Sequence, residues 1–164
     1  MKILTQRQIQ QKIKRLAIEI LENHYDSPAL ILAGINNNGY GFAQLLHAQL
    51  QHLTSIPVTL TRIRLNPADP LSSDVQIDMP TEALNGKSVI IVDDVANTGR
   101  TIFYAFKPLH AVLPQKVEVA VLVDRKHKSF PIQVDYVGLS LATTLLDDID
   151  VQIVNVAEQA VFLN

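Results

Sequence analysis

Hydrophobic positions along the chain follow two periods, one typical of amphipathic helices and the other of buried strands. Residues 6–23 carry apolar side chains at helical spacing, and Thr5 with Gln8 has the form of a capping box at the start of this stretch. Runs that are apolar throughout, typical of strands buried on both faces, occur at residues 29–33, 89–92 and 117–123. The other predicted elements are helices at 42–53 and 101–113 and strands at 56–63, 134–137 and 151–156.

Strands that alternate with helices predict an α/β fold, in which a mainly parallel sheet is covered by helices on both faces. We expect one domain spanning residues 1–164, with Pro108 kinking its helix or ending it early. Residues 34–41 predict a polar turn. Residues 65–80, with three prolines and little periodicity, predict a long loop of the kind that is functional or disordered. In such sheets ligands bind beyond the carboxyl ends of the strands, so candidate chemistry should lie there.

Composition narrows the class of protein. Hydrophobic residues make up 48% and charged residues 18% of the chain, as in ordinary soluble globular proteins. No apolar run approaches the ~20 residues needed to cross a bilayer, and the N-terminus lacks the features of a signal peptide. We therefore expect a cytoplasmic protein without a membrane partner. The absence of cysteine excludes disulfides, thiolate metal sites and cysteine nucleophiles.

Charges are distributed unevenly, although the net charge is only −2. Residues 1–15 contain five basic residues and no acidic one. A second basic run lies at residues 125–128, and an acidic one at 147–150. Short charge runs are usually solvated faces, so by themselves they establish no partner.

The predicted strand at 89–92 delivers two adjacent carboxylates, Asp93 and Asp94, to the carboxyl edge of the sheet. Adjacent carboxylates are costly there unless a cation or hydroxyl groups meet them. The next loop brings Thr98, Gly99 and Thr101 to a helix start, where hydroxyls and free backbone N–H groups favour an anion. One ligand that carries both ring hydroxyls and a phosphate would satisfy the aspartate pair and the loop at the helix start. The alternative is that the aspartates form a turn and Thr98 only caps the helix.

The whole segment 89–101, VIIVDDVANTGRT, resembles the signature by which type I phosphoribosyltransferases bind phosphoribosyl pyrophosphate (PRPP). The resemblance implies a phosphoribosyltransferase fold with a small hood, and a catalytic pair, Asp93 and Asp94, that binds the ribose 2′- and 3′-hydroxyls. Mg²⁺ would sit mainly on PRPP oxygens and water, with no protein metal site. A base nitrogen would replace pyrophosphate at the anomeric carbon, helped by positioning and charge stabilisation. The residues implied to hold the 5′-phosphate are Val95, Ala96, Asn97, Thr98, Gly99, Arg100 and Thr101.

Two features of the sequence indicate which nucleobase the protein would use. Enzymes of this class that use 6-oxopurines usually carry an aspartate at position 97 as proton acceptor, whereas Asn97 cannot act as a general base. Segment 119–138, VAVLVDRKHKSFPIQVDYVG, is similar to the PyrR family, which are bifunctional pyrimidine attenuation regulators and uracil phosphoribosyltransferases. A histidine such as His127, taken alone, is more often a surface or core residue than a ligand contact, and only the surrounding segment makes a ligand contact equally consistent. The base pocket implied by this resemblance, partly through backbone groups, is formed by Asp124, Arg125, His127, Tyr136 and Val137.

The chain departs from the family in two loops. The family's pyrophosphate loop commonly reads G-I-x-T-R-G, whereas the matching GINNNG has no cation, so any binding there would depend on Asn side chains and backbone N–H groups. The implied pyrophosphate-loop residues are Asn36, Asn37, Asn38 and Gly39. The lid typically reads D-I-T-x-Y-R-D-D, where this chain has TRIRLNP, and alternation would place its Arg62 and Arg64 on one face as candidate lid cations. Both departures put the rate of turnover in question more than the binding of PRPP.

The leading hypothesis is a phosphoribosyltransferase of nucleotide salvage whose partners are PRPP and a nucleobase, with uracil favoured over hypoxanthine or guanine. A second hypothesis, which the basic runs favour, is an RNA-binding regulator that senses nucleotides in the same pocket; phosphate contacts would make its RNA binding depend on salt. A third is a nucleotide-binding paralogue with weak activity, suggested by the asparagine-rich loop. The resemblance also implies a homodimer or a higher homo-oligomer.

Overall fold

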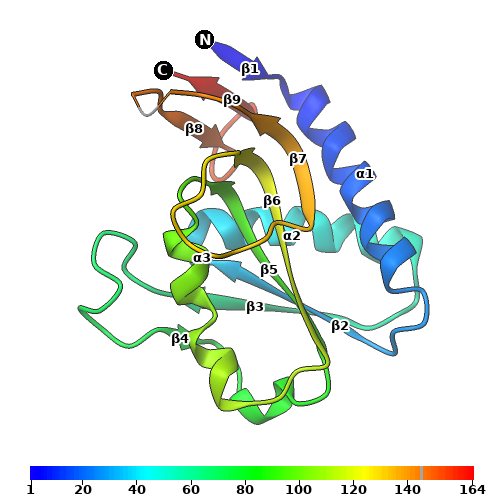
Figure 1. The fold of residues 1–164 in the computed structure, drawn as a ribbon. Coiled ribbons are helices and arrows are strands. Elements are labelled where there is room, and N and C mark those ends of the chain that lie inside the picture. The colour runs from blue at the N-terminus through cyan, green and yellow to red at the C-terminus, as the bar shows by residue number, and fades with distance from the viewer. Residues whose placement is uncertain (145) are drawn as a thin grey trace.

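The computed structural model describes residues 1–144 and 146–164, in which strands alternate with helices along most of the chain (Figure 1). The helices are α1 (Gln6–Asn23), α2 (Asn36–Leu53) and α3 (Arg100–Ala105), with 3-10 helices η1 (Thr81–Leu84) and η2 (Lys107–Ala111). The strands are β1 (Lys2–Leu4), β2 (Leu30–Ile35), β3 (Val58–Arg64), β4 (Gln76–Ile77), β5 (Ser88–Ala96), β6 (Lys116–Arg125), β7 (Tyr136–Leu141), β8 (Ile149–Gln152) and β9 (Ala160–Leu163).

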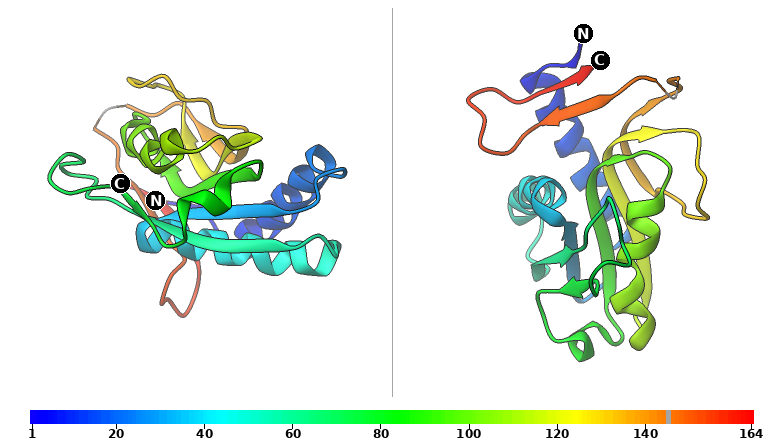
Figure 2. Two further views of the ribbon diagram at one scale, coloured as in Figure 1. Left: turned by 90° about the horizontal axis from the view of Figure 1, so that it is seen from below. Right: turned by 90° about the vertical axis from the view of Figure 1, so that its left-hand side faces the viewer.

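The main sheet has the strand order β4-β3-β2-β5-β6-β7. All neighbouring pairs in it run parallel except β3 with β4, which is a short antiparallel edge strand. Helices α1 and α2 cover one face, and α3 with η2 covers the other (Figure 2). The predicted fold class, a mainly parallel sheet with helices on both faces, is therefore confirmed.

Strand β2 shows why such strands are apolar throughout. All of its residues are buried, and successive side chains point to opposite faces of the sheet. Leu30 and Leu32 pack in the cluster beneath α1 and α2, whereas Ile31 and Ala33 pack in the cluster beneath α3. Because both faces need apolar side chains, the strand shows no alternation in its sequence.

A second sheet, which we call the hood, joins the two ends of the chain. Its strand order is β1-β9-β8, and Lys2 of β1 pairs with Phe162 of β9 (Figures 1 and 2). The Met1 ammonium group also donates a hydrogen bond to the carbonyl of Leu163 at 2.8 Å. A hood was expected from the resemblance, but β1 and β9 were not predicted. Strands this short carry little periodicity, and each forms by pairing with a partner far away in sequence.

Helix α1 has the bounds predicted from its periodicity. The Thr5 hydroxyl accepts a hydrogen bond from the Gln8 backbone N–H at 3.3 Å, and the Gln8 side-chain oxygen accepts one from the Thr5 N–H at 2.9 Å. This capping box satisfies donors that the first turn of the helix leaves free. Its buried side chains, Ile9, Ile13, Leu16, Ala17 and Ile20, are the apolar positions of the sequence pattern.

Several predicted elements have different bounds, among them the strands expected at 134–137 and 151–156, which are β7 at Tyr136–Leu141 and β8 at Ile149–Gln152. The expected turn at 34–41 is wrong, because β2 continues to Ile35 and α2 begins directly at Asn36. Strand β5 extends past the expected residue 92 to Ala96, since its pairing with β6 continues to that point. Helix α3 ends at Ala105, before Pro108, which agrees with the expected early end. The long loop at 65–80 is present except for the two residues of β4.

A buried polar cluster lies at the amino ends of β6 and β7. Glu118 accepts hydrogen bonds from the Tyr136 hydroxyl at 3.0 and 3.1 Å, and its carboxylate lies 2.5 Å from the His24 ring Nε2. Burial raises the pKa of Tyr136, so its hydroxyl stays protonated and donates. Lys116 adds a cation 3.5 Å from the same carboxylate. The cluster satisfies a carboxylate that would otherwise be costly to bury.

Replacing Tyr136 with Phe should lower the free energy of unfolding by about 1.5–3 kcal/mol, because a buried carboxylate loses a donor. Urea unfolding followed by circular dichroism measures the change. Tyr25→Phe is the matched control, since Tyr25 is 82% exposed and its change should stay within about 0.5 kcal/mol. Equal effects of the two variants would show that His24 and Lys116 alone satisfy Glu118.

Candidate functional site

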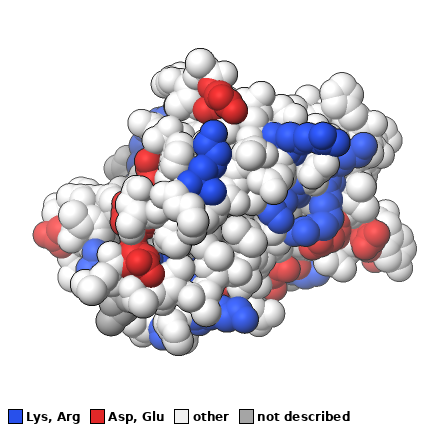
Figure 3. Space-filling model, turned by 90° about the horizontal axis from the view of Figure 1, so that it is seen from above, with Lys and Arg blue, Asp and Glu red and all other residues white. Residues whose placement is uncertain are grey.

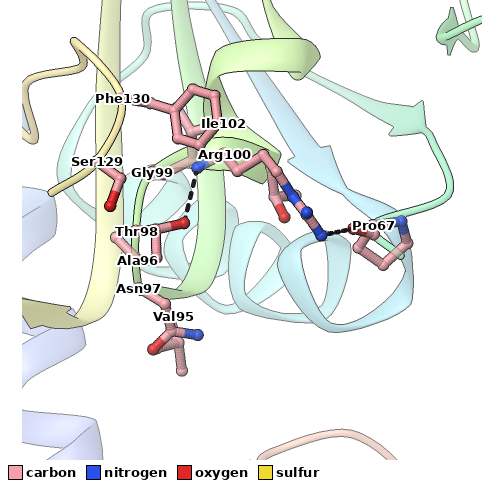
Figure 4. Close-up of a pocket in the computed structure, with 11 residues that line it drawn as sticks. Pro67, Val95, Ala96, Asn97, Thr98, Gly99, Arg100, Ile102, Ser129 and Phe130 are labelled. Carbon is pink, nitrogen blue, oxygen red and sulfur yellow. Dashed lines mark hydrogen bonds between the residues drawn. The ribbon is translucent and has the colours of Figure 1, made fainter. Parts of the chain in front are cut away.

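A cavity of about 570 Å³ opens at the carboxyl end of β5 (Figure 4). Residues 95–102 form most of its wall, and Pro67, Ser129 and Phe130 complete it. All seven residues predicted to hold a 5′-phosphate, Val95 to Thr101, therefore line one cavity. The cavity presents backbone N–H groups together with the hydroxyls of Thr98, Thr101 and Ser129, which are groups that can bind an anion.

Backbone contacts hold the loop between β5 and α3 in this shape. The Thr98 carbonyl accepts hydrogen bonds from the backbone N–H groups of Ser129 at 2.9 Å and Phe130 at 3.2 Å. Gly99 has a φ of 89°, which L side chains rarely adopt, and a Cβ there would lie 2.7 Å from Ile132 Cγ1. Glycine is therefore required at this position by both backbone conformation and space.

The two aspartates lie side by side at the end of β5. Asp93 is 8% exposed and Asp94 is half-buried. Asp93 Oδ1 accepts a hydrogen bond from the Asp94 N–H, and Asp94 Oδ1 accepts one from the Val95 N–H, both at 2.9 Å. Burial, followed by the neighbouring Asp94 carboxylate, raises the pKa of Asp93 well above its ordinary value. The pair therefore favours a ligand that brings hydroxyl donors or a cation.

The first turn of α2 lies against the same strand. A Cβ on Gly39 would lie 2.6 Å from the Val92 carbonyl oxygen and 3.2 Å from Asp93 Oδ1. Only glycine lets the helix approach so closely. Asn37 and Asn38 are exposed, whereas the Asn36 side-chain oxygen accepts a hydrogen bond from the Leu65 N–H at 3.1 Å. The structure thus brings the predicted pyrophosphate residues next to Asp93, on a helix start instead of a turn.

Arg62 and Arg64 come from the end of β3 but have different partners. Arg62 lies over the ring of Tyr40 at 4.2 Å and donates to Asn37 Oδ1 at 3.2 Å. Arg64 forms a bidentate pair with Asp78, with donor–acceptor distances of 2.8 to 3.0 Å. This pairing lowers the pKa of Asp78. Of the two predicted lid cations, the structure brings Arg62 to the first turn of α2.

The predicted base-pocket residues fall into two groups. Asp124 lies beside Ala96 near the end of β6, and its carboxylate accepts a hydrogen bond from Lys128 Nζ at 2.7 Å. Arg125 ends β6 and reaches the carbonyls of Thr144 and Asp147, and His127 is exposed. Asp124 and Arg125 therefore lie at the carboxyl edge of the sheet, where β5 leads into the loop before α3.

Tyr136 and Val137, the other two predicted base-pocket residues, begin β7, which runs parallel to β6. Val137 pairs with Val121, and Val121 pairs with Asp93, so Val137 lies level with Asp93 two strands along the sheet. The carbonyl of Val137 accepts a hydrogen bond from Arg15 at 2.8 Å, whereas the Tyr136 side chain is buried on Glu118. A base-pocket role for these two residues stays a prediction.

Four residues at the cavity were not predicted, namely Pro67, Ile102, Ser129 and Phe130. Ser129 and Phe130 reach the cavity because their backbone binds Thr98, and Phe130 also packs near Phe103 with ring centroids 5.4 Å apart. Pro67 belongs to the long loop, and its carbonyl accepts a hydrogen bond from Arg100 at 2.6 Å (Figure 4). None of these contacts has a local sequence signal, although the length of the 65–80 loop indicated a functional or disordered segment.

Comparison with known proteins assigns the fold. Residues 2–160 match the family described as the phosphoribosyl transferase domain. A protein of Streptococcus uberis named bifunctional protein PyrR is 37% identical over 147 residues, covering 88% of this chain and 84% of its own. A protein of the same name from Macrococcus caseolyticus is 33% identical over 157 residues, covering 92% and 90%.

Solved structures of low sequence identity share the architecture. A hypoxanthine-guanine phosphoribosyltransferase of Bacillus anthracis superposes with a TM-score of 0.71 at 20% identity, covering 85% of this chain and 81% of its own. A hypoxanthine phosphoribosyl transferase of Trypanosoma cruzi reaches a TM-score of 0.75 at 20% identity, covering 98% and 90%. At this identity the likeness concerns the fold, which is that of the type I phosphoribosyltransferases, as the resemblance implied.

Two further properties concern the described residues. None of their helices combines the length and the apolar character that a membrane span requires. Within the same residues, no group of three or more His, Asp or Glu side chains is arranged to hold a metal ion.

Replacing Asp93 with Asn should stabilise the folded protein at neutral pH, because a buried carboxylate next to Asp94 loses its charge. Since the folded pKa of Asp93 is raised, the folded state binds this proton more tightly than the unfolded state does. The wild-type free energy of unfolding should therefore fall, relative to that of Asp93→Asn, as pH rises from about 4 through the raised pKa. Urea titrations of both proteins at several pH values measure the difference.

The matched control for this prediction is Asp26→Asn, which removes an exposed carboxylate. Its free energy of unfolding should follow that of the wild type at every pH. The prediction fails if Asp93→Asn and the wild type keep the same difference in stability between acid and neutral pH.

Proposed function

We propose a function from the premise that the chain belongs to the phosphoribosyl transferase family and, within it, to the PyrR group. The protein transfers the ribose 5-phosphate of PRPP to a nucleobase, most favourably uracil, and releases pyrophosphate. One observation carries this proposal: the phosphate cavity, the aspartate pair and the first turn of α2 meet at a single edge of the sheet. That edge offers, side by side, groups for a phosphate, for ribose hydroxyls and for a second anion.

The loop between β5 and α3 would hold the 5′-phosphate. Its backbone N–H groups and the Thr98 and Thr101 hydroxyls line the cavity, and the contacts of Thr98 with Ser129 and Phe130 keep the loop in place. A binding site that is already formed spares the ligand the cost of ordering the loop. Fixing this phosphate also fixes the position of the anomeric carbon relative to Asp93 and the first turn of α2.

Asp93 and Asp94 would accept hydrogen bonds from the ribose 2′- and 3′-hydroxyls. Their negative charge also suits the positive charge that develops on the sugar ring as the bond to pyrophosphate breaks. A nearby cation fits this pair, because burial and the neighbouring Asp94 carboxylate disfavour the ionisation of Asp93 in its absence and so raise its pKa. Mg²⁺ bound chiefly through PRPP oxygens would supply that charge and neutralise the leaving group.

Uracil is proposed because of two features of the residues that would face the nucleobase. Asn97 stands where a purine-specific enzyme of this class would place a proton acceptor, and an amide cannot take a proton at neutral pH. Asp124 is held by Lys128 beside the phosphate loop, with Arg125 and the exposed His127 adjoining it. These residues, together with backbone groups of the same loop, are proposed to face the base. Val137 is kept in this proposal because it lies level with Asp93 on β7, whereas the Tyr136 side chain is bound to Glu118.

Purified protein incubated with PRPP, Mg²⁺ and one of uracil, hypoxanthine, guanine or adenine should release pyrophosphate fastest with uracil. Asp94→Asn should lower this rate by about a hundredfold or more, since a group that stabilises the transition state is lost. Asp26→Asn, which changes an exposed carboxylate in the same way, should keep the wild-type rate. If none of the four bases leads to release of pyrophosphate, transferase activity is refuted. A faster rate with a purine than with uracil would refute the assignment of uracil.

RNA binding is a second candidate function, favoured by the basic face of α1. Lys and Arg side chains gather over this helix in the view from above (Figure 3). A cavity of about 470 Å³ there is lined by Lys12 and Arg15 together with Gln8 and Gln11. Burial, and then the charge of Arg15, lower the pKa of Lys12, which indicates how closely the positive charges are placed. Such a patch attracts phosphate groups although the whole chain has a net charge of −2.

Filter binding with a pyrimidine-operon leader RNA tests this function. The affinity should rise when a uridine nucleotide is added and should fall steeply with salt concentration. Lys12→Gln should weaken binding and reduce the dependence of log affinity on log salt by about 0.7 to 0.9. Lys87→Gln, an exposed lysine outside this cavity, is the control. Absence of any nucleotide-dependent affinity would exclude the regulatory function.

A further inference from the structure

Arg62 occupies an unusual position for a charged side chain at the end of a strand. Its guanidinium group lies 4.2 Å from the centre of the Tyr40 ring, and one of its nitrogens donates to Asn37 Oδ1 at 3.2 Å. Its Nε is buried and has no hydrogen-bond partner among the described residues. A buried donor without a partner is costly, and an anion is the partner that a guanidinium binds best.

The helix start beside Arg62 carries no charge, and the nearby carboxylate of Asp78 is bound by Arg64. The first turn of α2 consists of three asparagines and Gly39, and it contains no charged side chain. Asn37, Asn38 and Arg62 line a common cavity of about 530 Å³. Arg62 therefore adds a full positive charge to the end of an 18-residue helix where only backbone N–H groups and amides would otherwise face an anion.

The order of groups along the edge of the sheet matches the order of groups in PRPP. The phosphate cavity follows β5, the aspartates end β5, the first turn of α2 follows the neighbouring β2, and Arg62 lies on β3 beyond it. Gly39 touches Asp93 on one side of that turn, while Asn37 receives the Arg62 hydrogen bond on the other. A ribose held at Asp93 would thus direct its pyrophosphate towards Arg62.

We propose that Arg62 is the cation that binds the pyrophosphate group of PRPP, acting from β3 because the first turn of α2 has no basic residue. This inference rests on the proposed transferase function. The Tyr40 ring holds the plane of the guanidinium, and Asn37 occupies only one of its nitrogens, so donors in a fixed geometry remain for phosphate oxygens. Arg64, on the same strand, does not share this role, because Asp78 binds it in bidentate fashion.

Calorimetric titration with PRPP and with ribose 5-phosphate, each with Mg²⁺, tests the role of Arg62. Ribose 5-phosphate lacks the pyrophosphate, so it reports on the phosphate cavity and the aspartates alone. Arg62→Gln should weaken the affinity for PRPP by about tenfold or more, which is the effect of losing one charged hydrogen bond. Its affinity for ribose 5-phosphate should change by less than about twofold. Arg64→Gln is the matched variant on the same strand, and it should weaken the affinity for PRPP by less than about threefold.

A compensating change separates this role from a structural one. Adding Asn38→Arg to Arg62→Gln places a guanidinium in the first turn of α2 and should recover most of the lost affinity for PRPP. Arg62→Lys keeps the positive charge but loses the planar set of donors of the guanidinium. Its affinity for PRPP should lie between that of the wild type and that of Arg62→Gln. It also serves as the test variant if Arg62→Gln does not fold.

The outcomes that overturn the inference are distinct. Unchanged PRPP binding by Arg62→Gln, equal weakening of both ligands, or equal effects of Arg62→Gln and Arg64→Gln would each reject the role of Arg62 alone. Failure of Asn38→Arg to restore binding would reject it as well. Wild-type protein that binds neither PRPP nor ribose 5-phosphate would reject the proposed function, and the inference with it.

Discussion

Parallel pairing of β3, β2, β5 and β6 is the constraint on which the rest of the structure depends. It places the carboxyl ends of all four strands at one edge, so that residues far apart in sequence become neighbours there. Arg62, Asn37, Asp93 and Asp124 share that edge for this reason alone. The apolar side chains that fill both faces of the sheet hold the edge rigid, with the amphipathic face of α1 and the packing of α2 completing one layer.

The groups at this edge are arranged at a cost to stability. Asp93 is buried beside a second carboxylate, Arg62 has a buried nitrogen without a partner among the described residues, and Asn36 has a positive φ of 52°. Each of these features by itself lowers the stability of the folded protein. All three lie at the candidate site. At the opposite edge, Glu118 is satisfied by His24, Tyr136 and Lys116, so a buried carboxylate there serves stability. The contrast supports a binding role for the unsatisfied edge.

Several parts of the fold and the site were predictable because their signals are local. The capping box and apolar spacing define α1, the apolar runs define β2, β5 and β6, and Pro108 ends α3 early. The segment from Val89 to Thr101 predicted a single anion-binding loop, and its residues from Val95 onwards line one cavity. The strands β1 and β9 were missed because they are short and form by pairing, β1 with β9 across the whole chain and β9 also with β8. The turn expected at 34–41 was wrong because packing against Val92 and Asp93 overrides the poor helix propensity of its asparagines and glycines.

The sequence by itself determined the fold class, the family and the loop at 95–101 that lines one cavity, since each depends on residues that are neighbours along the chain. Tertiary structure decided which distant residues join that loop. The register of β7 binds the Tyr136 side chain to Glu118 and leaves Val137 level with Asp93, and the end of β3 brings Arg62, but not Arg64, to the first turn of α2. The physical reason is that strand register and side-chain pairing are set by long-range packing and hydrogen bonds, which leave little trace in local sequence.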